Sequence, residues 1–213
     1  MNGVNFGEYH SYTDFNLILS SKTIGKAEPK IETVDLPAGD GVIDYTEYFG
    51  DVHYKNRTLT FDFSTIVPQS EFESLYSNIQ NAIHGRKMRV WLDDDSDHYY
   101  FGRVSVNEWK SNGRIGKITI DVDCEPWKYN LYKTMRTFDI SETTEILLLN
   151  SRKPAVPKIT PNANMSITFG NTTYNLTANV EYSDPQITLI QGSNFFTVAG
   201  TGTIVFEWQE GGL

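Results

Sequence analysis

A single segment of this chain, residues 68–85, has helical periodicity, and it is set within a sequence that otherwise alternates between strands and turns. Ser70 followed by Glu73 has the spacing of a capping box, and Gly85 stands where a left-handed residue ends a helix. The polar face carries no catalytic grouping. We therefore predict a structural helix over residues 70–84 that covers one face of a β scaffold. Its apolar residues recur every three or four positions, and so share one face: Phe72, Leu75, Tyr76, Ile79, Ala82 and Ile83.

The sequence on both sides of this segment alternates apolar and polar residues with a period of two, as half-buried strands do. Turn formers at Pro37–Gly41 separate two of these stretches, and Asp93–Asp97 separates two more. Asn112-Gly113 predicts a tight hairpin between Val104–Trp109 and Ile115–Cys124. The other predicted strands are Phe15–Leu19, Lys30–Leu36, Thr58–Phe63, Met88–Leu92 and Tyr99–Val106.

The second part of the chain has a different composition. Three prolines lie between residues 154 and 161, and short runs rich in Thr, Ile, Val and Phe follow them. Turn residues separate these runs at the spacing typical of a β-sandwich. We predict a mainly β protein with two domains. Residues 1–133 form a β-sandwich with the helix 70–84 and a β-hairpin, and residues 134–213 form a smaller β-sandwich, with 134–161 as a connecting region. The runs are Met165–Phe169, Thr173–Leu176, Gln186–Ile190, Phe195–Val198 and Thr203–Trp208.

The charge composition argues against nucleic-acid binding. The chain of 213 residues has 18 Lys and Arg against 27 Asp and Glu, a formal net charge of −9, and its densest basic stretch is only Arg86–Arg89. Proteins that bind phosphate backbones tightly need clustered cations, and this sequence has no such cluster. An acidic surface is instead compatible with a channel through which DNA passes without binding.

No constellation of catalytic or metal-binding residues stands out. Asp93–Asp97 lacks the ligand spacing of a calcium loop, and the four histidines have no zinc-site spacing. His84 is interpreted as a structural residue at the end of the helix. Carboxylate pairs that hydrolyse glycosides depend on a distance that a sequence does not give. We predict no enzymatic activity, with no catalytic, cofactor-binding or metal residues and no cofactor.

Cys124 is the only cysteine, so the chain cannot form an internal disulfide. It follows Ile118, Ile120 and Val122 at alternate positions, which predicts a small buried apolar residue rather than a reactive thiol. The first residues have no signal-peptide pattern, and no apolar stretch is long enough to span a membrane. We expect a soluble protein made in a cytoplasm.

Aromatic side chains are abundant, and those at Tyr45, Tyr48, Phe49 and Tyr54 lie among acidic residues. Two interpretations stay open for this cluster. The rings either contact a partner protein or a sugar, or they form part of a β-sandwich core. For Phe61, Phe63 and Trp91 we favour the core.

The order of these features resembles one family of proteins. The features are Phe6, the turn at Pro37–Gly41, Tyr54-Lys55-Asn56-Arg57 leading into a strand, the single helix, the strand Met88–Leu92, a hairpin, Glu125-Pro126-Trp127, and the closing residues Phe206–Leu213. Together they resemble the distal tail (Dit) proteins of long, non-contractile-tailed phages (siphoviruses) and prophages of Gram-positive bacteria, over almost the whole chain.

The resemblance implies a virion structural protein at the tail tip or baseplate, assembled in the cytoplasm of the host bacterium. It implies a homo-hexameric ring, single or as two stacked rings, formed by the N-terminal domain. Implied partners are the tail tube protein, the tail-associated tip protein and, in some phages, receptor-binding proteins for host adsorption. DNA would pass through without specific binding, and no membrane insertion is implied. The C-terminal domain would resemble galectins and carbohydrate-binding modules.

We hypothesise that some of Asp40, Asp44, Asp51 and Asp93–Asp97 line the channel of such a ring. The alternative function is a stand-alone carbohydrate-binding module or lectin-like protein whose exposed Trp and Tyr rings stack on sugars. A third, more distant interpretation is a cell-wall glycosidase.

Overall fold

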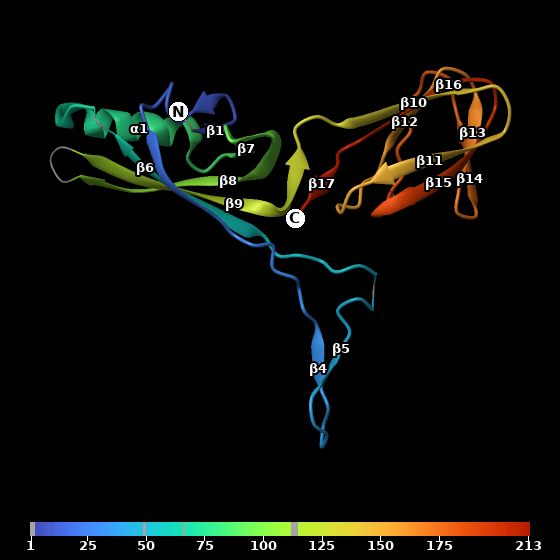
Figure 1. Ribbon diagram of the computed structural model, residues 1–213, viewed down its shortest axis with the longest axis horizontal. Coiled ribbons are helices and arrows are strands. Elements are labelled where there is room, and N and C mark those ends of the chain that lie inside the picture. Colours follow the sequence, from blue (N-terminus) through green and yellow to red (C-terminus); the bar gives the residue numbers. More distant parts are fainter. Residues whose placement is uncertain (1–2, 49, 66, 112–114) are drawn as a thin grey trace. The chain divides into compact units, whose positions relative to one another are not determined.

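The computed structural model describes residues 3–48, 50–65, 67–111 and 115–213. In these residues the chain is mainly β with one α-helix, as predicted, and it divides into two compact units, Met1–Trp127 and Lys128–Leu213 (Figure 1). The division falls inside a long strand, β9 (Gly116–Asn130), and so lies a little before the predicted boundary at residue 133.

Seven strands of the first unit form one sheet in the order β2-β1-β7-β8-β9-β6-β3. The strands β6 and β7 coincide with two predicted strands, whereas β3 begins only at Ile18 because Asn16 has a positive φ of 52°. β8 and β9 are neighbours, as the hairpin prediction requires; its turn at Asn112-Gly113 lies outside the described residues. The bounds are β1 Val4–Phe6, β2 Tyr9–His10, β3 Ile18–Ile24, β6 Arg57–Thr65, β7 Lys87–Leu92, β8 Asp95–Ser111 and β9 Gly116–Asn130.

This sheet curls so that its two ends face each other. Strands β1 and β6 are four steps apart in the sheet order, which in a flat sheet would separate them by about 19 Å. Instead the ring centroid of Phe6 on β1 lies 6.1 Å from that of Phe61 and 6.3 Å from that of Phe63, both on β6. The curled sheet therefore encloses a core between two layers, as a sandwich does, and the predicted core positions of Phe61 and Phe63 are confirmed.

The helix α1 (Phe72–Ile83) lies against this core with the predicted apolar face. Ile79 and Ile83 are fully buried in the core, and Leu75, Tyr76 and Ala82 are partly buried against it. Trp91, also predicted for the core, is only half-buried, because its neighbours Val90 and Leu92 take the inward positions of β7.

The predicted start of the helix is wrong. A 3₁₀ turn, η1 (Gln69–Glu71), precedes α1, the N-cap residue is Glu71, and no side chain caps the helix. The backbone N–H of Glu71 donates to the carbonyl of Pro68 at 2.9 Å, so the tighter turn occupies the position at which Ser70 would cap. The predicted end is confirmed, since Gly85 follows with a φ of 75°.

The second unit is a two-layer β-sandwich, as predicted. One sheet has the order β10-β16-β12 and the other β11-β15-β13-β14. Phe196 and Phe206, one from each sheet, have ring centroids 5.3 Å apart in the core. The bounds are β10 Thr134–Ile140, β11 Thr144–Asn150, β12 Lys158–Pro161, β13 Met165–Phe169, β14 Thr172–Leu176, β15 Gly192–Ala199 and β16 Gly202–Trp208, and the short β17 (Gly211–Gly212) pairs with the end of β9.

Two predicted segments of this part differ in the structure. Residues 134–161, expected as a connecting region, form β10, β11 and β12 of the sandwich, because Ile146, Leu148 and Ile159 are needed in its core. The predicted strand Gln186–Ile190 has only an isolated bridge, from Leu189 to Ala155, although Ile187 and Leu189 are fully buried.

Candidate interaction surfaces

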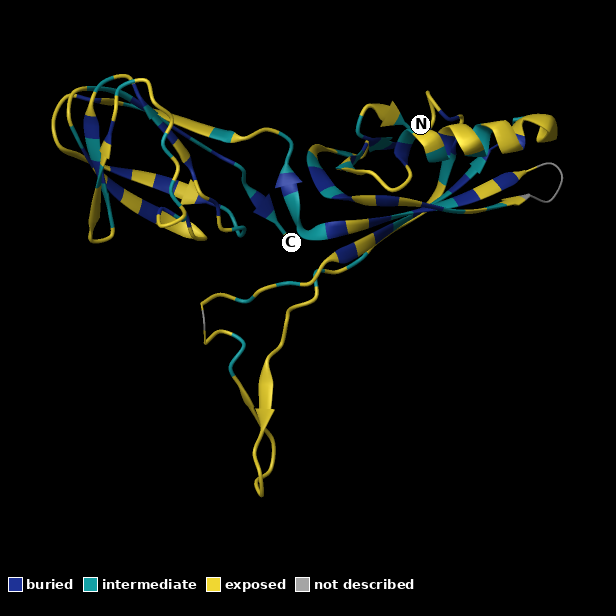
Figure 2. Ribbon diagram, turned by 180° about the vertical axis from the view of Figure 1, so that it is seen from behind, coloured by how far each residue is buried: buried dark blue, intermediate teal, exposed yellow. Residues whose placement is uncertain are grey.

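The first unit carries a long insertion between β3 and β6, which we call the arm (residues 25–56). Within the described part of the chain, its two short strands, β4 (Thr33–Asp35) and β5 (Val42–Asp44), pair only with each other. Figure 2 shows this hairpin almost entirely in the colour of exposed residues. A two-stranded hairpin is marginally stable alone in water, so an arm of this kind is suited to being covered by a partner.

Apolar side chains are exposed along the arm. Val34 and Ile43 are directly opposite each other in the register, and are 52% and 53% exposed. Ile31 is 64% exposed and Tyr48 78%. Exposed apolar residues gathered on one element are typical of a binding surface.

The aromatic cluster of the arm separates into different environments. Tyr48 is exposed, whereas the ring of Tyr54 contacts that of Trp127 at 5.6 Å between centroids. Tyr45 is half-buried beside a cavity of about 370 Å³. Phe49 lies outside the described residues. The core interpretation therefore fails for Tyr48, and the interface interpretation stays a prediction.

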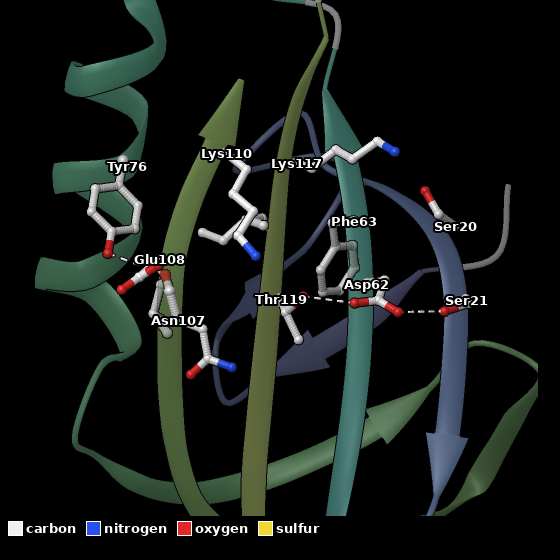
Figure 3. Close-up of a pocket in the computed structure, with 12 residues that line it drawn as sticks. Ser20, Ser21, Asp62, Phe63, Tyr76, Asn107, Glu108, Lys110, Lys117 and Thr119 are labelled. Carbon is white, nitrogen blue, oxygen red and sulfur yellow. Dashed lines mark hydrogen bonds between the residues drawn. The ribbon is translucent and has the colours of Figure 1, made fainter. Parts of the chain in front are cut away.

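A second surface is the side of the β3-β6-β9-β8 sheet that faces away from the core, which we call the polar sheet face. Its carboxylates accept hydrogen bonds from neighbouring strands. Asp62 accepts from the hydroxyls of Ser21 and Thr119, each at 2.7 Å (Figure 3). Asp121 accepts from the Thr60 hydroxyl and the Asn107 amide, also at 2.7 Å.

These hydrogen bonds hold the two carboxylate groups in place on the sheet. The hydroxyl of Ser21, followed by that of Thr119, lowers the pKa of Asp62 below its ordinary value. A hollow of about 860 Å³ opens over this region, and Lys110, Lys117 and Glu108 also line it. Most of the side chains that line the hollow are polar or charged. The hollow can therefore hold water or contact a polar surface of another molecule.

The acids that the sequence suggested for a channel lie outside the polar sheet face. Asp40, Asp44 and Asp51 belong to the arm. Asp93 accepts hydrogen bonds from the backbone N–H of Gly3 at 2.8 Å and the amide of Asn5 at 2.9 Å, and the His10 ring lies 3.1 Å from it. Asp94 pairs with Lys22, and Asp95 with His98 at 2.7 Å.

A third surface lies on β7 and β8, and we call it the basic patch. The register places Lys87 opposite Arg103 and Arg89 opposite Phe101. The ammonium of Lys87 lies 4.7 Å from the ring centroid of Phe101, and the guanidinium of Arg89 lies 4.6 Å from that of Tyr99. The sequence showed Arg86–Arg89 as its densest basic stretch, but not that Arg103 and two rings join it.

His84, which we interpreted as a structural residue, makes a structural contact. His84 accepts a hydrogen bond from the backbone N–H of Val106 at 3.0 Å through Nδ1, which ties the end of α1 to β8. Among the described residues, no three His, Cys, Asp or Glu side chains form a group that could hold a metal ion. Across the same residues, no helix has the length and apolar character that crossing a membrane requires.

Cys124 is buried, as predicted, with no exposed surface. Burial raises the pKa of its thiol to about 12, although the neighbouring Arg57 opposes the shift. We expect a thiol-specific disulfide reagent at pH 8 to leave Cys124 unmodified in the native protein and to label it fully in urea, because only the thiolate reacts. Rapid labelling of the native protein, measured by absorbance, would contradict this burial.

Comparison with known proteins identifies the fold. No family model matches the chain, and no curated protein sequence matches it. The crystal structure of SPP1 Dit (gp 19.1), described as a paradigm of the hub adsorption apparatus in phages that infect Gram-positive bacteria, is similar over 100% of both chains, with a TM-score of 0.71 and 15% sequence identity. The resemblance that the sequence suggested is thus confirmed for the fold, along the whole chain.

Proposed function

We propose that this protein is a structural hub of a phage tail adsorption apparatus. The observation that carries the proposal is the similarity to SPP1 Dit over the full length of both chains, covering both units and not one common β-sandwich alone. The proposed location is the virion, at the distal end of the tail, and the proposed role is structural and not enzymatic.

In this proposal the first unit assembles into a ring of six copies, which joins the tail tube to the tail-tip protein and to receptor-binding proteins where these exist. The exposed arm supports the proposal, because its apolar residues are available to a neighbouring copy. A contact between two different surfaces of one chain generates a closed ring when its rotation closes.

A ring of this kind would leave a central channel for DNA, and the polar sheet face has suitable chemistry for its lining. The carboxylate of Asp62 accepts from the hydroxyls of Ser21 and Thr119, which lower its pKa, and the carboxylate of Asp121 accepts from Thr60 and Asn107. Asp94, in contrast, pairs with Lys22, whose positive charge offsets it. Asp62, Asp121 and Glu108 outnumber Lys110 and Lys117 on this face, and a lining with net negative charge repels the phosphate backbone and lets DNA slide without binding.

Measurement of mass in solution tests this function. We expect a species at six times the chain mass of 24.2 kDa, or at twelve times for two stacked rings, with sixfold averages in negative-stain electron micrographs. The matched comparison is the isolated second unit, residues 128–213, which should remain a monomer. A full chain that stays monomeric at high concentration and binds glycans on an array would contradict the hub and favour the carbohydrate-binding alternative.

A further inference from the structure

The arm has one sign of charge along its outer part. Between residues 31 and 52 there are six carboxylates and no Lys or Arg. A positively charged surface therefore matches this part of the arm best, because like charges placed opposite each other are strongly unfavourable. The carboxylates are Glu32, Asp35, Asp40, Asp44, Glu47 and Asp51.

The arm combines this charge with apolar surface. In the β4–β5 register, Asp35 is opposite Val42, and Val34 is opposite Ile43. Consecutive residues of a strand point to opposite faces, so Val34 and Ile43 share one face, and Asp35 lies on the other. A surface that covers the face with Asp35 therefore needs cations, whereas Val34 and Ile43 lie on the opposite face of the ribbon.

The basic patch on β7 and β8 of the same unit supplies such cations. Lys87, Arg89 and Arg103 are exposed, and the rings of Phe101 and Tyr99 lie under two of these cations. Lys87 is also bonded to Glu125 at 2.7 Å, and Arg103 donates to the carbonyl of Gly85 at 2.6 Å, so both side chains are held in position. The patch thus presents oriented cations over aromatic surface.

The other cations on this sheet match the arm less well. Lys110 and Lys117 line the hollow of the polar sheet face, where Asp62 and Glu108 lie with them. The negative charge of these two acids would oppose an acidic arm. The β7–β8 patch also holds an acid, because Glu125 is paired with Lys87, and its match with the arm therefore rests on Arg89 and Arg103.

The length of the arm allows it to reach another molecule. About thirteen residues lead from Gly25 to the turn near Ala38, and at about 3.3 Å per residue the ribbon spans about 40 Å. That span exceeds the diameter of a small domain, which is about 30 Å. One copy's arm can therefore extend across the next copy.

We propose that the arm of one copy binds the basic patch of a second copy of this chain. The face of the arm that carries Asp35, together with Asp40 at the turn, lies against Arg89 and Arg103. The two surfaces differ, so the contact is heterologous and repeats around a ring. This contact rests on the proposed hub function, for which it names the surfaces that join neighbouring subunits.

Charge reversal tests the contact. The arm variant is Asp35→Lys with Asp40→Lys, the patch variant is Arg89→Glu with Arg103→Glu, and a third variant carries all four substitutions. We expect each double variant to weaken assembly at least about tenfold in dissociation constant, since reversal makes the facing charges alike. The fourfold variant should restore assembly, as opposite charges then face each other again. Mass photometry over a concentration series measures this.

A matched control carries Glu142→Lys with Glu145→Lys, two exposed acids of the second unit, and changes the net charge by the same amount as the arm variant. It should assemble like the wild type. Arg103 also bonds to Gly85, so Arg89→Glu alone is made as a second patch variant. Thermal unfolding of each variant confirms that it is folded before its assembly is compared.

The outcomes distinguish the contact from the hub function. A wild-type ring with arm and patch variants that assemble equally well would overturn the contact and leave the hub intact. Folded double variants that dissociate, with no rescue in the fourfold variant, would also overturn it. A wild type that never assembles would overturn the ring and the contact together. Loss in both double variants and recovery in the fourfold variant supports the contact.

Discussion

The Ile79→Ala variant is expected to lower the free energy of unfolding of the first unit by about 3 kcal/mol, within the range for large-to-small substitutions in a core. Ile79 has no exposed surface and lies in the core that α1 shares with the curled sheet. Removing its side chain beyond the β-carbon loses apolar burial and leaves a cavity that the rigid sheet fills only in part. Urea unfolding followed by circular dichroism measures the change.

The control is Asn78→Ala, the exposed residue immediately before Ile79 on the same helix. Alanine has the higher helix propensity, so this variant should be unchanged or more stable by a few tenths of a kcal/mol, roughly. Leu75→Ala, at a partly buried position, should fall between the two. A loss below about 1 kcal/mol for Ile79→Ala would show that α1 does not pack in the core as described, because buried Ile→Ala changes cost more.

The Asn150→Ala variant is expected to destabilise the second unit by about 3 kcal/mol, since each buried polar group left without a partner costs about 1–3 kcal/mol. Asn150 is 6% exposed. Its amide donates to the carbonyls of Lys153 at 2.9 Å and Leu189 at 3.2 Å, and its oxygen accepts from the indole N–H of Trp208 at 3.1 Å. Alanine would leave the buried indole N–H without this acceptor and the half-buried carbonyl of Lys153 without this donor, whereas the carbonyl of Leu189 keeps its bond from the backbone N–H of Ala155.

Asn175→Ala is the control in the same sandwich, because Asn175 is an exposed residue of β14. It should change the free energy of unfolding by no more than about 0.5 kcal/mol, as surface substitutions do. Differential scanning calorimetry of both variants reports the transition of the second unit. Equal stability of the two variants would mean that the Asn150 network contributes nothing beyond a surface side chain.

The predictions from sequence succeeded where the spacing of apolar residues within one element was enough to make them. The apolar face of α1 follows from spacings of three and four, and Ile79 and Ile83 lie where this spacing places them. The strand Met165–Phe169 was predicted with the bounds that the structure gives it. In both cases side chains within one element are enough to define which face is buried.

The predictions failed where a distant segment decides the outcome. Ser70 has the sequence of a capping residue, but a 3₁₀ turn after Pro68 moves the start of the helix to Phe72. Residues 134–161 have three prolines near their end and indicate a connector, yet their apolar residues complete the core of the second sandwich. Local composition does not report which strands a segment pairs with.

The candidate surfaces depend on tertiary structure even more strongly. Alternation in Lys30–Leu36 predicted a strand. In the structure both faces of the short β4 are exposed, because nothing in the described part of the chain covers it. Asp62 and Thr119 are joined by the register of β6 and β9, and Lys87 and Arg103 by that of β7 and β8. Each pair is distant in sequence.

By itself, the sequence determined the mainly β class, the single helix and its buried face, the burial of Cys124 and the resemblance to a phage tail family. These follow from short-range periodicity and from the order of features along the chain. Only the tertiary structure decided how the sheet curls around its core, which carboxylates share a face and which cations gather on β7 and β8. Those outcomes depend on strand pairing between distant residues, and a local pattern in the chain does not encode that pairing.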